Sequence, residues 1–265
     1  MKYGFIGTGN MTSAIIKVMS EKVNGSDIYL SNRTKAKASA LAEKYSANLS
    51  SNLEIAKTCD YIVLGVKPQM MKGVLDEIKP ALAERDDFII VSMAAGFTID
   101  DYYEMVSKEC PLIRIMPNTP VMVNEGVILY CYKNIEKNRV DEFVNAIEKA
   151  GKLIDIDENH FDAAGTVSGC GPAFADMIIE ALADGGVYCG LTRKQSIELA
   201  AQMLVGAGKL VLESGKNPIA LKDEVTSPGG TTIVGVRTLE ENRVPYALMS
   251  AVINAYKKTE ELRKK

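Results

Sequence analysis

Short apolar runs alternate with amphipathic stretches along residues 1–157 of the chain. Between the runs, apolar residues recur at helical spacing, as in the Thr34–Tyr45 and Glu136–Ala150 segments. Strands that alternate with helices predict an α/β fold with a doubly wound, mostly parallel sheet, because a parallel connection needs a crossover that is usually a helix. The runs typical of buried strands are Lys2–Ile6, Asp27–Leu30, Tyr61–Val66, Phe88–Val91, Leu112–Met116, Glu125–Tyr132 and Leu153–Ile156.

Beyond Asp157 the strand-like runs disappear and helical periods take over. The predicted helices begin at Pro172, at a capping box formed by Thr192 and Gln195, at Thr231 and at Pro245. Their apolar faces are wide for so short a region, and they make a poor solitary core. We therefore expect helices of two chains to pack together, in an obligate dimer or a ring of dimers.

A tight glycine turn, Gly7-Thr8-Gly9-Asn10-Met11, follows the first strand and precedes a helical pattern. Strand, glycine turn and helix in this order indicate a dinucleotide-binding unit, in which Gly7 permits the turn and Gly9 lets a pyrophosphate approach the helix start. Thr12 stands where a full fingerprint has its third glycine. We expect an N-terminal NAD(P)-binding Rossmann domain over residues 1–157 and an all-α dimerisation domain over residues 158–265.

The end of the second strand bears on the choice of cofactor. An NAD-binding unit has an acidic residue there for the ribose hydroxyl, but this chain has Ser31, Asn32, Arg33 and Thr34. Donors and a positive charge suit a 2′-phosphate, so the sequence favours NADPH, with NADH possible. The alternative is a solvated turn that leads into the next helix.

Composition excludes several other classes of protein. The net charge is −3 and the basic residues form no stripe, which argues against nucleic-acid binding. The five cysteines form no CxxC pair and no cluster with the single histidine, so we expect no metal site and no disulfide framework. The N-terminus is not typical of a signal peptide, and no apolar run approaches the ~18 residues of a membrane span. These features favour a reducing, cytoplasmic location.

The stretch Val225–Gly235 (VTSPGGTTIVG) is rich in glycine, proline and hydroxyl groups. Ser227 can cap a helix and Pro228 can occupy its first turn. The free amides at such a helix start form a site for a small anion such as a carboxylate, and a threonine hydroxyl can bond a neighbouring polar atom. An ordinary capped helix explains the same residues, so the stretch alone leaves both readings open.

Several motifs occur together in order: FIGTGNM, SNRT, VKP, SMAAG, RIMPNTP, SGCGPAF, ALADGGVYCGL and LKDEVTSPGGTTIVGVRTLE. The chain resembles the pyrroline-5-carboxylate reductase family over essentially its whole length, and the last motif is the most specific. The resemblance implies NAD(P)H-dependent reduction of the C=N bond of 1-pyrroline-5-carboxylate to L-proline, the last step of proline biosynthesis. It also implies a homodimer through the C-terminal helices, an active site between the two domains, and possible larger rings such as a decamer.

The resemblance also implies roles for individual residues. The substrate carboxylate would be held by the amides of Gly230, Thr231 and Thr232, the Thr232 hydroxyl would bond the ring nitrogen, and Glu158 would lie near the substrate. Cofactor contacts are implied for residues at the predicted strand ends and in the turns that follow, namely Ile6, Gly7, Thr8, Gly9, Asn10, Met11, Asn32, Arg33, Asn52, Val66, Lys67, Pro68, Ala94, Met116, Asn118 and Thr119.

Two other functions are compatible with a Rossmann half. A β-hydroxyacid dehydrogenase shares the two-domain plan. Enzymes of that class resemble one another in a helix that carries a catalytic lysine soon after a glycine-rich turn. This chain has no lysine after SGCGP until Lys194, which argues against that class. A non-catalytic dinucleotide sensor would have no use for the hydroxyl-rich stretch near the C-terminus. His160 is the only histidine, and we expect it at the surface or in packing rather than in catalysis.

Overall fold

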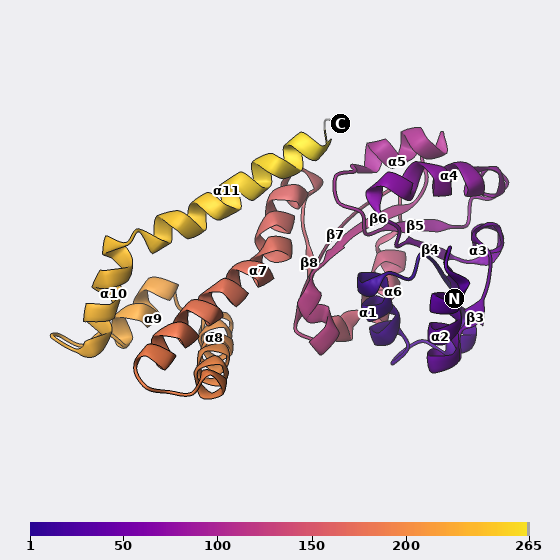
Figure 1. Ribbon diagram of the computed structural model, residues 1–265. Helices are drawn as coiled ribbons and strands as arrows, with labels where there is room; N and C mark the ends of the chain where they lie inside the picture. Colours follow the sequence, from indigo (N-terminus) through magenta and orange to yellow (C-terminus); the bar gives the residue numbers. More distant parts are fainter. Residues whose placement is uncertain (264–265) are drawn as a thin grey trace. The chain divides into compact units, whose positions relative to one another are not determined.

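The computed structural model describes residues 1–263, in which an α/β region is followed by helices (Figure 1). Its strands form one eight-stranded sheet in the order β3-β2-β1-β4-β5-β6-β7-β8. Neighbouring strands are parallel except for the antiparallel pair β6 and β7. The strands are β1 (Tyr3–Ile6), β2 (Ile28–Ser31), β3 (Asn48–Leu49), β4 (Tyr61–Leu64), β5 (Ile89–Ser92), β6 (Leu112–Pro117), β7 (Gly126–Lys133) and β8 (Gly151–Asp155).

Helices cover both faces of this sheet. They are α1 (Asn10–Met19), α2 (Lys35–Tyr45), α3 (Asn52–Thr58), α4 (Pro68–Ala83), α5 (Ile99–Val106) and α6 (Lys137–Ala146), with short 3-10 turns η1 (Gly25–Asp27), η2 (Thr119–Val123) and η3 (Glu148–Ala150). Side chains of β4 alternate between the faces: Tyr61 and Val63 pack with α1, α2 and α6, whereas Ile62 and Leu64 pack with α3, α4 and α5. A strand buried on both faces explains the continuous apolar runs in the sequence. The predicted doubly wound fold is confirmed.

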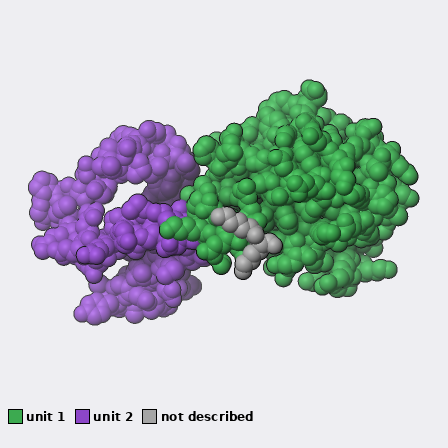
Figure 2. All heavy atoms as spheres, turned by 90° about the horizontal axis from the view of Figure 1, so that it is seen from above, with its two compact units in different colours: residues 1–169, 256–265 green, residues 170–255 purple. Residues whose placement is uncertain are grey.

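The remaining helices are α7 (Glu158–Tyr188), α8 (Arg193–Ser214), α9 (Pro218–Glu224), α10 (Thr231–Glu241) and α11 (Val244–Arg263). The chain divides into two compact units: residues 170–255, and residues 1–169 together with the segment from Tyr256 onward (Figure 2). The predicted capping box of Thr192 and Gln195 is present at the start of α8. Lys264 and Lys265, which end the predicted helical domain, lie outside the described residues.

The helical unit buries few side chains in a single chain. Only Ala183, Ser196 and Ala200 of residues 170–255 are buried. Large apolar residues such as Met177 and Leu212 are 69% and 83% exposed.

Within residues 1–263, no helix combines the length and apolar character needed to cross a bilayer.

The prediction that Pro172 opens a helix is wrong. Helix α7 begins at Glu158, where the Asp157 carboxylate accepts the Asn159 amide at 2.8 Å, and Pro172 lies inside the helix. Proline normally disfavours a helix interior because it cannot donate to the carbonyl four residues earlier. Here that carbonyl, of Ser168, accepts the Asn118 side-chain amide at 3.0 Å, which removes part of the penalty.

The prediction that Ser227 caps a helix and Pro228 occupies its first turn is also wrong. Helix α10 begins at Thr231 with Gly230 as its N-cap, and no side chain caps it. The Gly230 amide instead donates to the Ser227 carbonyl at 3.0 Å, and Gly229 has a φ of 68°. Proline followed by a glycine with positive φ suits a type II turn, which is why these residues form a turn before the helix.

Candidate active site

A long groove of about 990 Å³ lies at the carboxyl ends of β1, β2 and β4. Strand β1 pairs with β2 on one side and with β4 on the other, so the groove lies where the direction of the sheet's connections reverses. Ligands of open α/β sheets bind at this place. Nine of the predicted cofactor residues line the groove: Ile6, Gly7, Thr8, Gly9, Asn32, Arg33, Asn52, Val66 and Lys67.

The other predicted cofactor residues do not line this groove. Asn10 and Met11 form the first turn of α1, and Pro68 is the first residue of α4. Ala94 follows β5 and is buried. The remaining three lie at or just after the end of β6, namely Met116, Asn118 and Thr119.

The glycine turn leaves room for a ligand at the start of α1. Gly7 has a φ of 97°, and a Cβ there would lie 2.7 Å from the Gly65 carbonyl oxygen, so only glycine fits. A Cβ on Gly9, the N-cap of α1, would meet nothing within 4 Å. The buried Thr8 hydroxyl has no hydrogen-bond partner among the described residues. An open helix start and an unsatisfied hydroxyl fit the pyrophosphate of a dinucleotide.

Thr12 replaces the third glycine of the dinucleotide fingerprint, and Gly65 accommodates it. The Thr12 side chain is buried and its hydroxyl donates to the Gly65 carbonyl at 3.4 Å. A Cβ on Gly65 would lie 2.2 Å from the Thr12 hydroxyl oxygen. The close approach of α1 to the sheet, which a glycine in the helix usually permits, is therefore permitted here by a glycine after β4.

Asn32 holds the loops of the groove together. Its Oδ1 accepts the Thr8 amide at 3.1 Å, and its Nδ2 donates to the Thr34 carbonyl at 3.0 Å. Both polar groups of the side chain are thus engaged with the main chain. This arrangement ties the end of β2 to the glycine turn.

Asn52 forms part of a second network in the groove wall. The Ser31 hydroxyl donates to Asn52 Oδ1 at 2.6 Å, and Asn52 Nδ2 donates to Glu77 Oε2 at 2.8 Å. Sequence reasoning missed Glu77, because α4 shows only an ordinary amphipathic pattern. Ser51 caps α3 and thereby places Asn52 at the start of that helix. A serine followed three residues later by a glutamate, here Glu54, is a pattern that predicts such a cap from the sequence.

Three exposed cations line the end of the groove beyond β2. They are Arg33, Lys35 and Lys37, and none forms an ion pair with another described residue. The first turn of α2 contains no acidic residue. Unpaired cations at a helix N-terminus favour a bound phosphate.

A buried cation connects β6 with α7. Arg114 is 3% exposed, and it pairs with Glu158 at 2.7 Å and with Asp162 at 3.4 Å. Its guanidinium lies 4.3 Å from the centre of the Phe161 ring. The same Glu158 oxygen accepts the Ile99 amide at 2.7 Å at the start of α5. Glu158, a predicted substrate residue, therefore belongs to a structural network.

The amides that are predicted to hold the substrate carboxylate lie in the helical unit, at the start of α10. The Gly230 amide is bonded within the preceding turn, so Thr231 and Thr232 provide the first amides of α10 that lack a helical partner. Both threonines are exposed, and Ser227 Oγ would lie 2.4 Å from a Cβ on Gly230. The turn and the helix start therefore present main-chain donors beside two hydroxyl groups.

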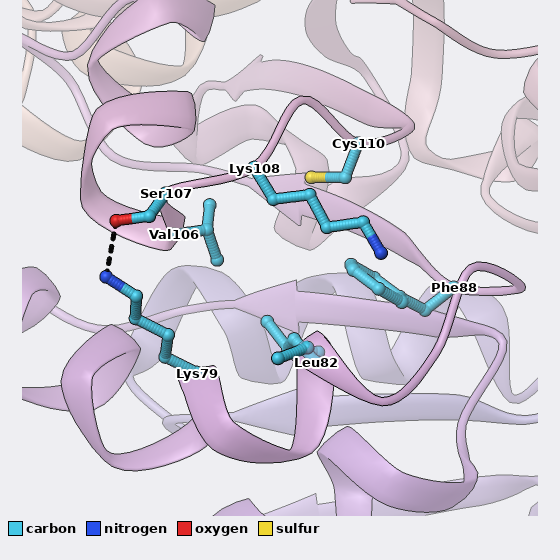
Figure 3. Close-up of a pocket in the computed structure, with 8 residues that line it drawn as sticks. Lys79, Leu82, Phe88, Val106, Ser107, Lys108 and Cys110 are labelled. Carbon is cyan, nitrogen blue, oxygen red and sulfur yellow. Dashed lines mark hydrogen bonds between the residues drawn. The ribbon is translucent and has the colours of Figure 1, made fainter.

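Figure 3 shows a second cavity, which has a volume of about 310 Å³. Phe88 and Cys110 in its lining precede β5 and β6, so the cavity is at the amino ends of those strands. Lys79 Nζ donates to Ser107 Oγ at 2.5 Å, and Figure 3 marks this hydrogen bond with a dashed line. Burial raises the pKa of the Cys110 thiol to about 11, so it is not a nucleophile near neutral pH. The described residues also contain no cluster of metal-ligating side chains.

Comparisons with known proteins agree with the geometry of the groove. Residues 2–96 match a family described as "NADP oxidoreductase coenzyme F420-dependent". Together with the Rossmann sheet, this match defines the chain as an NADP-dependent oxidoreductase. Residues 158–262 match the family "Pyrroline-5-carboxylate reductase dimerisation". The predicted NADP cofactor and the predicted oligomerisation through C-terminal helices are thus confirmed.

Full-length relatives identify the family. Pyrroline-5-carboxylate reductase of Arabidopsis thaliana is 38% identical, over 98% of this chain and 95% of that protein. The Plasmodium falciparum pyrroline carboxylate reductase, solved with NADP bound, is 34% identical with a TM-score of 0.86, over 99% of this chain and 98% of that one. The Coxiella burnetii pyrroline-5-carboxylate reductase is 29% identical with a TM-score of 0.91, over 98% of both chains. The chain belongs to the pyrroline-5-carboxylate reductase family.

Proposed function

We propose that this chain reduces the C=N bond of 1-pyrroline-5-carboxylate to L-proline with NADPH, as the last step of proline biosynthesis. The observation that carries the proposal is the family-specific dimerisation region at residues 158–262, on the same chain as a dinucleotide groove. NADPH, when bound, supplies the hydride for the imine carbon. The chain has to orient the two reactants, anchor the carboxylate and support the nitrogen as it becomes an amine.

The residues of the glycine turn are proposed to hold the pyrophosphate. Gly7 and Gly9 give the backbone access, and the main-chain amides of Asn10 and Met11 at the start of α1 face the anion. The Thr8 hydroxyl is supported as a ligand because it has no hydrogen-bond partner in residues 1–263. Ile6 ends β1 directly beneath this turn.

The adenosine end of the cofactor is proposed to lie against Asn52 and Arg33. Arg33 provides a charge for the 2′-phosphate, and Lys35 and Lys37 add to it from the start of α2. Asn32 is proposed to act by holding the loop, since both of its side-chain groups bond the main chain. This arrangement favours NADPH, with NADH as a poorer donor.

The nicotinamide end is proposed to extend toward the ends of β4, β5 and β6. Support comes from their position at the carboxyl edge of the sheet. The residues proposed for this end are Val66, Lys67, Pro68, Ala94, Met116, Asn118 and Thr119. Asn118 is assigned there through its main chain, because both polar groups of its side chain bond other segments.

The start of α10 is proposed to hold the substrate. The amides of Thr231 and Thr232, with Gly230 leaving the backbone bare, suit the carboxylate. The Thr232 hydroxyl is proposed to bond the ring nitrogen and is the one side chain assigned to the reacting atoms. Glu158 is proposed to lie near the substrate, and its ion pair with Arg114 holds its carboxylate in place.

No strong side-chain acid is needed for the protonation. An imine nitrogen is far more basic than a ketone oxygen, so the ring can enter as the iminium and receive the hydride at carbon while its nitrogen keeps the proton. His160 is exposed at the first turn of α7, which supports a role outside catalysis.

We further propose that residues 1–157 act as the cofactor domain and residues 158–265 as the dimerisation and substrate domain. A ring of dimers such as a decamer is compatible with the exposed apolar helices. A cytoplasmic location is supported by the five free cysteines.

The proposed reaction is tested by following NADPH absorbance with pyrroline-5-carboxylate, and in parallel with a β-hydroxyacid and its keto partner. Turnover with the cyclic imine alone, and formation of L-proline, are expected. Tight NADPH binding without turnover of any substrate would contradict the proposal and favour a dinucleotide sensor. Running NADH beside NADPH tests the cofactor assignment in the same experiment.

A further inference from the structure

The side chain of Asn118 bridges two segments of the main chain. Asn118 follows β6 directly and is 7% exposed. Its Oδ1 accepts the Val127 amide on β7 at 2.8 Å, and its Nδ2 donates to the Ser168 carbonyl on α7 at 3.0 Å. Because Pro117 pairs with Ile128 in the β6–β7 ladder, the first bond continues the ladder with a side-chain acceptor.

The Ser168 carbonyl needs this donor because of Pro172. In a regular α-helix the carbonyl of residue 168 accepts the amide of residue 172, and proline has no amide hydrogen. The Ser168 hydroxyl is committed elsewhere, since it donates to the Ala164 carbonyl at 3.1 Å. Asn118 thus donates to a carbonyl in the helix interior that Pro172 leaves without its regular donor.

This bond is the last of a row of contacts along β6. Alternate strand residues face the same side, and here they meet successive turns of α7. Arg114 pairs with the first turn, and a Cβ on Gly165 would lie 3.6 Å from Met116. Asn118 completes the row at Ser168. The row therefore ends at the carboxyl edge of the sheet, on the side where ligands bind.

We infer that Asn118 is a positioning residue, which replaces the missing amide of Pro172 and thereby fixes the loop between β6 and β7 against α7. The inference rests on the proposed reductase activity, in which this loop borders the nicotinamide end of the cofactor. Loss of the bond frees the loop and slows hydride transfer. It leaves the groove at the glycine turn intact, because other residues line that groove.

A double-mutant cycle on the full-length protein tests this inference. Asn118→Ala is expected to lower kcat roughly tenfold and to change the KM for NADPH by less than about twofold. In the Pro172→Ala background the helix regains its own amide, so the same substitution is expected to lower kcat by less than about threefold. Thermal midpoints are measured on all four proteins and are expected to show the same coupling.

Pro80 provides a matched control, because it also lies inside a helix. Asn118→Ala should have its full effect in a Pro80→Ala background. Equal effects of Asn118→Ala in the Pro172→Ala and Pro80→Ala backgrounds would overturn the inference. An unchanged kcat in Asn118→Ala would overturn the positioning role.

The outcome stays decisive if Asn118→Ala does not fold alone. A folded Asn118→Ala/Pro172→Ala protein would then support the inference, and an unfolded one would overturn it. The thermal midpoints need no substrate, so they report on the Asn118–Pro172 coupling independently of activity. A wild-type protein without turnover would refute the proposed reaction and leave that coupling measurable.

Discussion

The sheet-containing unit and the helical unit bury their apolar residues differently. In the former, large side chains such as Tyr61 and Phe143 are fully buried within one chain. In the latter, Met177, Leu199 and Leu212 are 60–83% exposed, although they lie on well-formed helices α7 and α8. Apolar positions on the inner strands β1, β4 and β5 are covered by helices of the same chain, whereas the apolar stripes of the helical unit need a second chain. The match to a dimerisation family over residues 158–262 agrees with this difference.

The largest expected effect comes from charging the exposed apolar face of α8. Leu199 and Met203 are four residues apart and 60% and 48% exposed. Replacing both with aspartate buries two unpaired charges in the dimer, and we expect dimer affinity to fall by at least about a thousandfold. Analytical ultracentrifugation measures the change.

Leu53→Asp is the matched control, because Leu53 is 39% exposed on α3 of the other unit. This variant should remain dimeric. If the α8 variant stayed dimeric as well, the apolar face of α8 would not be the interface.

Thr232→Ala is expected to have the next largest effect. Loss of its hydroxyl should lower kcat/KM by about one to two decades, in line with the ~1–3 kcal/mol of a lost bond to a polar partner. NADPH affinity should change little, because Thr232 does not line the groove. Thr232→Ser keeps the hydroxyl and should retain most of the activity. Normal turnover by the alanine variant would remove Thr232 from the mechanism.

Arg33→Ala tests whether cofactor choice belongs to the sheet-containing unit. We expect it to weaken NADPH by roughly tenfold, because an exposed cation contributes modestly and two lysines share the site. NADH lacks the 2′-phosphate and should be affected much less. Lys44→Ala, at the other end of α2, removes the same charge away from the groove. Equal effects of Arg33→Ala on both cofactors in fluorescence titrations would refute the 2′-phosphate assignment.

The smallest expected effect is alkaline destabilisation of the sheet-containing unit. Burial raises the pKa of the Cys110 thiol from 9.0 to about 11 and that of Cys131 to about 12. The unfolded chain therefore loses these protons first, so the free energy of unfolding is fully retained below pH 9.0 and declines as pH rises toward the folded pKa. Denaturant titrations from neutral to alkaline pH measure this decline.

Cys110→Ala should make the alkaline decline shallower, because one raised pKa is removed. An identical pH dependence in wild type and Cys110→Ala would contradict the thiol assignment.

Much of the sheet was predictable because a strand buried on both faces needs a continuous apolar run, as Tyr61–Leu64 shows. The two-residue strand β3 has no period to detect. The start of α7 was missed because Pro172 is a breaker by local rules, and its tolerance depends on Asn118, which is distant in sequence. In the groove, the glycine turn was readable from spacing. Glu77 was not, because only the fold brings it to Asn52.

The most direct test is to supply NADPH that carries deuterium at the transferable position of its nicotinamide and to analyse the product by mass spectrometry. Deuterium in L-proline, on the ring carbon that had been double-bonded to nitrogen, is the predicted result. Formation of proline without deuterium, or oxidation of NADPH without proline, would contradict direct hydride transfer to the cyclic imine.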